Sequence, residues 1–114
     1  MAAVYVSNII INIGSDFSQT FTLQGADTNS AFNLTSYTAE SKMRKWSGST
    51  ASIEFDVAIN YPATSGKLTL SLTSVQTSTI KPGRYIYDVV ITDLNNIKNR
   101  VIEGMVIVRE GATY

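Results

Sequence analysis

The side chains that could do chemistry in this chain are carboxylates, lysines, tyrosines and hydroxyls, because its 114 residues include no histidine and no cysteine. The usual general base, the usual transition-metal ligand and the strongest nucleophile are therefore absent. Disulfides and thiolate-bound zinc or iron–sulfur centres are excluded for the same reason. We expect a protein that is not an enzyme and that binds no cofactor or metal.

Asp88 is the carboxylate whose setting most resembles that of a catalytic acid, since it stands in a run of Val, Ile and Tyr residues. No second acid stands at a spacing that would form a hydrolytic pair with it. A carboxylate in a strand can instead pair with an arginine on the facing strand, and Arg100 is a candidate partner. The sequence predicts a structural ion pair at Asp88.

One cluster of basic and aromatic residues, formed by Lys42, Arg44, Lys45 and Trp46, could contact phosphate or stack on a sugar or base. A solvated strand face that ends in a partly buried tryptophan is the more ordinary interpretation. Nine basic and nine acidic residues cancel over the whole chain. Nucleic acid and anionic membranes are therefore not expected as partners, and protein contacts are.

The elements that must position these side chains are short strands. β-Branched and aromatic residues gather in runs separated by Gly, Asn, Asp, Ser and Thr, a pattern typical of an antiparallel sandwich or barrel. We predict an all-β antiparallel sandwich of seven to eight short strands. The runs are 4–13, 17–24, 37–46, 53–59, 67–72, 84–92 and 101–109. Apolar and polar residues alternate in the second and fifth runs, so one face of each is core. The last run is apolar on both faces, which indicates cover on both sides.

The first run is more apolar than a half-exposed edge strand needs to be. One interpretation is a strand that crosses from one sheet of the sandwich to the other. The second interpretation is a strand that completes a sheet or a groove on a neighbouring subunit. The sequence leaves both open.

The chain is long enough for one domain, residues 1–114, that buries about two-thirds of its unfolded surface. Its first residues contain no positively charged region and no long apolar core before a cleavage site, so no signal peptide is predicted. No apolar run is long enough to cross a bilayer. We expect a soluble protein that is made in a cytoplasm and has no membrane partner.

A corner is predicted between the fifth and sixth runs, where a polar segment leads into Lys81-Pro82-Gly83-Arg84. Proline fixes φ and glycine tolerates positive φ, so this segment should turn rather than continue as a helix. Tyr85 follows the corner directly and resembles the tyrosine corner of immunoglobulin-like sandwiches, in which a buried hydroxyl bonds back to upstream backbone. Tyr87 should share its face of the strand.

Five stretches carry a family resemblance: residues 4–9, 32–45, 66–73, 82–89 and 101–108. Together they resemble the small virion structural proteins of tailed phages, especially phages of cyanobacteria. They are also similar to the amino-terminal immunoglobulin-like domain of phage baseplate upper proteins, which carries "Leu-Thr-x-Tyr" and "Gly-x-Tyr-x-Tyr-Asp-Val" signatures. The resemblance covers nearly the whole chain. It implies a non-enzymatic building block of the tail, neck, baseplate or capsid surface, synthesised in the host cytoplasm and located in the virion.

The partners that this resemblance implies are other virion proteins and copies of the chain itself. A rigid sandwich suits the task, because its edges and loop ends can be repeated around a symmetry axis. We expect assembly contacts where apolar residues lie near the free ends of the chain. The expected contact residues are Val4, Tyr5, Val6, Ile9, Ile11, Arg109 and Tyr114.

A carbohydrate-binding or host-adhesion module is the alternative from another functional class. Aromatic rings can stack on the faces of sugars, and Tyr5, Trp46 and Tyr61 are the candidates. This alternative predicts that the three rings lie together and exposed on one concave surface, where they would hold a host glycan.

Overall fold

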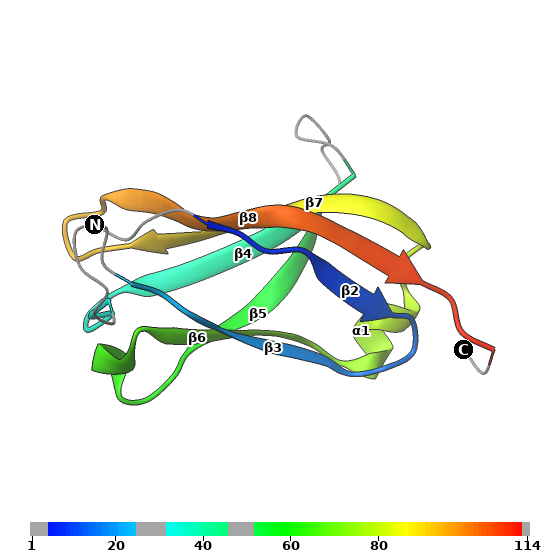
Figure 1. Ribbon diagram of the computed structural model, residues 1–114, viewed down its shortest axis with the longest axis horizontal. Coiled ribbons are helices and arrows are strands. Elements are labelled where there is room, and N and C mark those ends of the chain that lie inside the picture. The colour runs from blue at the N-terminus through cyan, green and yellow to red at the C-terminus, as the bar shows by residue number, and fades with distance from the viewer. Residues whose placement is uncertain (1–4, 25–31, 46–51, 113–114) are drawn as a thin grey trace.

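The computed structural model describes residues 5–24, 32–45 and 52–112, and it is almost entirely built of strands (Figure 1). In chain order the elements are β1 (Tyr5–Val6), β2 (Ile9–Asn12), β3 (Phe17–Thr22), β4 (Thr38–Arg44), β5 (Ile53–Ile59), the 3₁₀ helix η1 (Ala63–Ser65), β6 (Lys67–Leu72), α1 (Ser74–Ser78), β7 (Gly83–Thr92) and β8 (Lys98–Arg109). The prediction of an all-β sandwich of seven to eight strands is confirmed.

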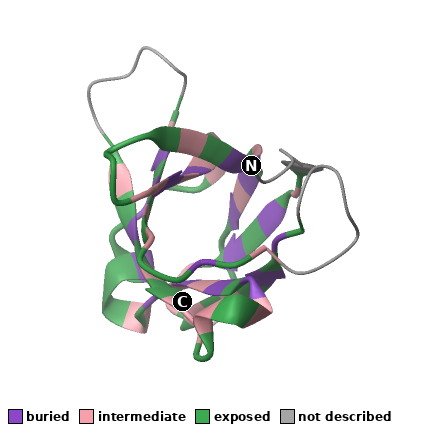
Figure 2. Ribbon diagram, turned by 90° about the vertical axis from the view of Figure 1, so that its left-hand side faces the viewer, coloured by how far each residue is buried: buried purple, intermediate pink, exposed green. Residues whose placement is uncertain are grey.

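The strands follow one hydrogen-bonded path, β1-β8-β7-β4-β5-β6-β3, and β2 also pairs with β8. β5 serves both layers, because residues 53–55 pair with β4 and residues 56–59 pair with β6. We call β1, β2, β8, β7 and β4 the first sheet, and β5, β6 and β3 the second sheet. Figure 2 shows the two layers end-on.

The first predicted run differs from expectation, because it forms two strands that both run parallel to β8. It does not cross between the sheets, and the sandwich is therefore not purely antiparallel. Ser7 and Asn8 lie between β1 and β2, and there the backbone departs from the regular hydrogen-bond ladder with β8. Parallel pairing lets Ile9 and Ile11 of β2 fill the core beside β8, where both are buried.

The core lies between the two sheets and follows the alternation in the sequence. Leu68, Leu70 and Leu72 of β6 are buried, as are Val89 and Ile91 of β7. Burial of one such side chain contributes about 1.5–3 kcal/mol. An aromatic chain crosses the layers: the Phe55 ring centroid lies 5.9 Å from that of Phe17 and 6.2 Å from that of Tyr87. The two sheets are thus joined by close packing.

The predicted corner contains one short helix that the sequence interpretation did not foresee. α1 begins after Thr73, whose side chain accepts a hydrogen bond from the Gln76 N–H while Gln76 reaches back to the Thr73 N–H. This capping box satisfies two N–H groups that a helix start leaves free. Thr77, which is buried, donates to the Ser15 carbonyl at 2.9 Å. The helix therefore ties the corner to the turn between β2 and β3.

The tyrosine corner is confirmed. The Tyr85 hydroxyl donates to the carbonyl of Lys81 at 2.8 Å, although this bond is exposed rather than buried. Tyr85 and Tyr87 point to the same side of β7, and Tyr87 is buried. No helix in the described residues is both long enough and apolar enough to span a membrane.

Candidate interaction face

The outer face of the first sheet carries large apolar side chains that are open to solvent. Val6, Ile10, Ile86 and Met105 are exposed by 69%, 55%, 38% and 38%. Strand register places them near one another, because Ile86 lies opposite Met105 while Val6 and Ile10 pair with residues two positions to either side of Met105. We call these four side chains the apolar patch.

Beside the apolar patch, the same face holds a network of charges. Arg100 places its Nε 3.3 Å from Asp88 Oδ2 and its Nη1 3.7 Å from Glu103 Oε2, so the predicted pair of Asp88 with Arg100 is confirmed. Lys42 of β4 lies opposite Asp88 in the register. These groups line an open groove of about 690 Å³ together with Val6 and Ile86.

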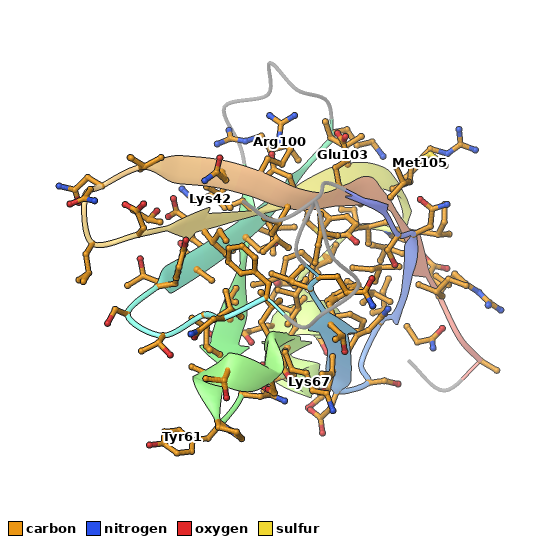
Figure 3. All side chains as sticks on the ribbon, turned by 60° about the vertical axis from the view of Figure 1, so that its left-hand side comes forward. Lys42, Tyr61, Lys67, Arg100, Glu103 and Met105 are labelled. Atoms are coloured by element: carbon orange, nitrogen blue, oxygen red, sulfur yellow. The ribbon has the colours of Figure 1, made fainter. Side chains whose placement is uncertain are left out.

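The groove combines an open hollow with side chains of both charges. Figure 3 shows Lys42, Arg100, Glu103 and Met105 along one side of the molecule. Ion pairs as exposed as these contribute only about 0–1 kcal/mol to stability. No group of three or more His, Cys, Asp or Glu in the described residues could hold a metal ion. An open groove with both signs of charge beside an apolar patch has the features of a surface that can contact another surface.

The outer face of the second sheet is different. Within the described strands β3, β5 and β6, no large apolar side chain is exposed. The Thr20 and Thr69 hydroxyls are 2.9 Å apart, and Thr69 also donates to Asn60 Oδ1 at 2.9 Å. The other large exposed apolar residues of the described chain lie in turns or in α1. They are Tyr61, Val75, Leu94 and Ile97.

A junction at Ser7 and Asn8 fixes the edge of the first sheet. The Tyr87 hydroxyl donates to the Ser7 carbonyl at 2.5 Å, and the Met105 N–H donates to Asn8 Oδ1 at 3.0 Å. A Cβ atom at Gly104 would collide with the Ser7 carbonyl, so glycine is required for this close approach. The junction holds β1 and β2 against β8 and so keeps Val6 and Ile10 on the outer face.

The residues expected at an assembly interface differ in their exposure to solvent. Val6 and Arg109 are exposed. Ile9 and Ile11 are only 1% and 0% exposed, so predicting them as contact residues was wrong: they fill the core of their own chain. Val4 and Tyr114 lie outside the described residues, and of Tyr5 only the backbone, in β1, is described.

Three patch residues were not named from the sequence: Ile10, Ile86 and Met105. A signal for Met105 was present, because the last run is apolar on both faces and was expected to be covered on both. Ile10 belongs to the first run, whose excess of apolar residues was also a signal, whereas Ile86 lacks one, since strand pairing decides which neighbours it has. The register across β2, β8 and β7 brings these residues together.

Of the three rings in the sugar-binding alternative, the structure describes only that of Tyr61. Tyr61 is 99% exposed and points away from the body of the molecule, on the side opposite Arg100, Glu103 and Met105 (Figure 3). Trp46 and the side chain of Tyr5 lie outside the described part of the chain. A shared concave surface for the three rings therefore stays a prediction.

No family model and no curated protein matches the sequence. Among solved structures, the SrpA adhesin from Streptococcus sanguinis is similar with a TM-score of 0.53 and 11% sequence identity, over 99% of this chain and 58% of that one. An internalin-like protein from Listeria monocytogenes gives a TM-score of 0.43 and 20% identity, over 95% of this chain and 28% of that one. This chain thus spans little more than half of the adhesin chain. At such low identity the likeness to the adhesin shows the sandwich fold alone.

Proposed function

We propose that the protein is a non-enzymatic building block of a tailed-phage particle, located in the tail, neck, baseplate or capsid surface. It binds neighbouring particle proteins, including copies of itself, through the outer face of the first sheet. The observation that carries the proposal is the confinement of strand-borne exposed apolar side chains to that sheet. Contiguous apolar surface with a polar rim is typical of protein-binding sites. The family resemblance of the sequence supports the same role.

Covering the apolar patch would contribute to the free energy of association. Each CH₂ group removed from water contributes about 0.8 kcal/mol. Covering the exposed parts of Val6, Ile10, Ile86 and Met105 therefore supplies several CH₂ equivalents toward association. The ion-paired groove beside the patch, formed around Arg100, can fix the orientation of a partner.

Incorporation into particles tests this function. Host cells that express a tagged copy of the protein are infected, and purified particles are assayed for the tag. The double variant Ile86→Arg/Met105→Arg places charge in the apolar patch, and Thr20→Arg/Thr69→Arg is the matched control on the second sheet. We expect the tagged protein and the control to be incorporated at a copy number set by particle symmetry, and the patch variant to be lost. Equal incorporation of both variants would contradict the proposed face.

A carbohydrate-binding or host-adhesion module is the second candidate, favoured by the nearly complete exposure of the Tyr61 ring. The likeness to the SrpA adhesin is compatible with it, but that likeness concerns the fold. Glycan-array binding that disappears in Tyr61→Ala and persists in Ile86→Arg/Met105→Arg would favour this module. Absence of glycan binding by the wild-type chain would remove it.

A further inference from the structure

A second hollow lies where β4 ends, β5 begins and the segment between α1 and β7 turns, and it shares only Arg44 with the described lining of the groove. Its volume is about 450 Å³. The lining is largely apolar, with the ring of Tyr85 and the side chains of a proline and three aliphatic residues. These residues are Met43, Ile53, Ile80, Pro82 and Tyr85.

The rim of this hollow is positively charged. Arg44, Lys45 and Lys81 line it, and no acidic residue is among its described lining residues. In the groove of the first sheet, by contrast, cations alternate with Glu40, Asp88 and Glu103. Two exposed lysines, Lys45 and Lys81, thus stand above an apolar floor in a chain that is neutral as a whole.

The rim is held in place by local contacts. The Lys45 ammonium lies 4.8 Å from the Tyr85 ring centroid, which is a cation–π distance. Gly83, with a φ of 143°, leaves room for this ammonium, since a Cβ atom there would stand 2.5 Å from Lys45 Nζ. The Tyr85 hydroxyl is bonded to the Lys81 carbonyl, so the corner backbone is fixed as well. A charged ligand would therefore meet a preformed rim.

We propose that this hollow binds an acidic peptide segment of a partner protein. A leucine- or phenylalanine-sized side chain enters the apolar floor, and flanking carboxylates pair with Lys45 and Lys81. Charge complementarity favours this occupant, because an acidic peptide with an apolar side chain satisfies both rim and floor. The site goes beyond the proposed assembly face and does not depend on the apolar patch.

The features of the hollow favour a peptide over a nucleic acid. Binding of single-stranded nucleic acid requires aromatic rings open to stacking and a continuous basic groove. Here Lys45 already covers a face of Tyr85. On the neighbouring sheet face, acids interrupt the line of cations.

Fluorescence anisotropy with the labelled peptide Asp-Leu-Asp-Phe-Asp tests the proposal. The neutral peptide Asn-Leu-Asn-Phe-Asn and a pentanucleotide of single-stranded DNA are the comparison probes. We expect the acidic peptide to bind most tightly and to weaken as salt rises. Lys45→Glu/Lys81→Glu should reduce its affinity about tenfold or more, whereas the exposed pair Lys67→Glu/Lys98→Glu, outside the hollow, should change it less than about twofold.

Peptide-induced amide shifts of the wild-type chain give a second readout that needs no variant. We expect the largest shifts at residues 43–45, 52–53 and 79–85. Equal binding of the neutral peptide, tighter binding of the DNA, or insensitivity to Lys45→Glu/Lys81→Glu would each overturn the proposal. The uncharged patch variant Ile86→Gln/Met105→Gln should keep peptide affinity, so failure of the assembly face and failure of this site remain distinguishable.

Discussion

The two outer faces of this sandwich follow the same alternation but not the same chemistry. β3 and β6 present serines, threonines and a lysine to solvent, whereas β7 and β8 present Ile86 and Met105 at positions that face each other. Both sheets close the same core, so the fold does not require apolar side chains on either outer face. An assembly contact on the first sheet, as proposed above, would account for this difference.

The two sheets also differ in how their edge strands are attached. β3 is joined to the rest of the described chain by the regular ladder with β6. The β1–β2 edge also pairs with β8, but its ladder is interrupted, and three special contacts at Ser7, Asn8 and Gly104 join it to the sheet there. The position of the apolar patch is thus fixed by a junction that side chains build, and substitutions there should have the largest effects.

The largest effect is expected for Gly104→Ala. The added Cβ would collide with the Ser7 carbonyl, so β1 and β2 must move away from β8 and the Asn8 bond must lengthen. We expect a loss of about 2–3 kcal/mol in the free energy of unfolding, measured in urea. Ser18→Ala, an exposed change on the second sheet, is the control and should alter it by less than about 0.5 kcal/mol. A Gly104→Ala protein as stable as the control would show that the junction does not hold the edge.

Tyr87→Phe should have the next largest effect. It leaves the ring packed against Phe55 but removes the hydroxyl that donates to the Ser7 carbonyl. A part-buried carbonyl without that donor costs about 1–2 kcal/mol. Thermal unfolding measures the change, and Tyr85→Phe, which loses an exposed bond, should cost less. The reverse order of the two tyrosines would contradict the role given to the junction.

Asp88→Asn should have a small, salt-dependent effect. It removes one carboxylate from Arg100 while Glu103 remains. We expect a loss of at most about 1 kcal/mol in the free energy of unfolding at low salt, because both side chains are substantially exposed. The difference from wild type should shrink in 1 M salt, as screening weakens the pair. A loss independent of salt would assign another role to Asp88.

Thr20→Val should have the smallest effect of the four. It breaks the exposed bond between the Thr20 and Thr69 hydroxyls but keeps a β-branched side chain in β3. We expect a change within about 0.5 kcal/mol in urea unfolding and no change in particle incorporation. Loss of incorporation would place a contact on the second sheet and remove the contrast between the faces.

Much of the sandwich could be predicted because its signals are local. The alternation of apolar and polar residues predicted the strands, and Pro82-Gly83 predicted the corner. Tyr85 predicted the hydrogen bond from its hydroxyl to upstream backbone. The parallel pairing of β1 and β2 with β8 joins residues about 97 positions apart, and no local pattern encodes it. For the same reason Ile9 and Ile11 were placed at a surface instead of in the core. α1 is too short for a periodic signal, although its capping box from Thr73 to Gln76 was readable.

The most direct test of the central claim is oxidative footprinting of the free protein and of the protein in intact particles. Methionine oxidises readily when exposed, so Met105 reports on the apolar patch and buried Met43 gives the unreactive baseline. Tyr61, on the opposite side, is the internal control. We predict that assembly slows oxidation of Met105 and leaves that of Tyr61 unchanged. Oxidation of Met105 at the same rate in particles as in the free protein would contradict the proposal that this face is covered.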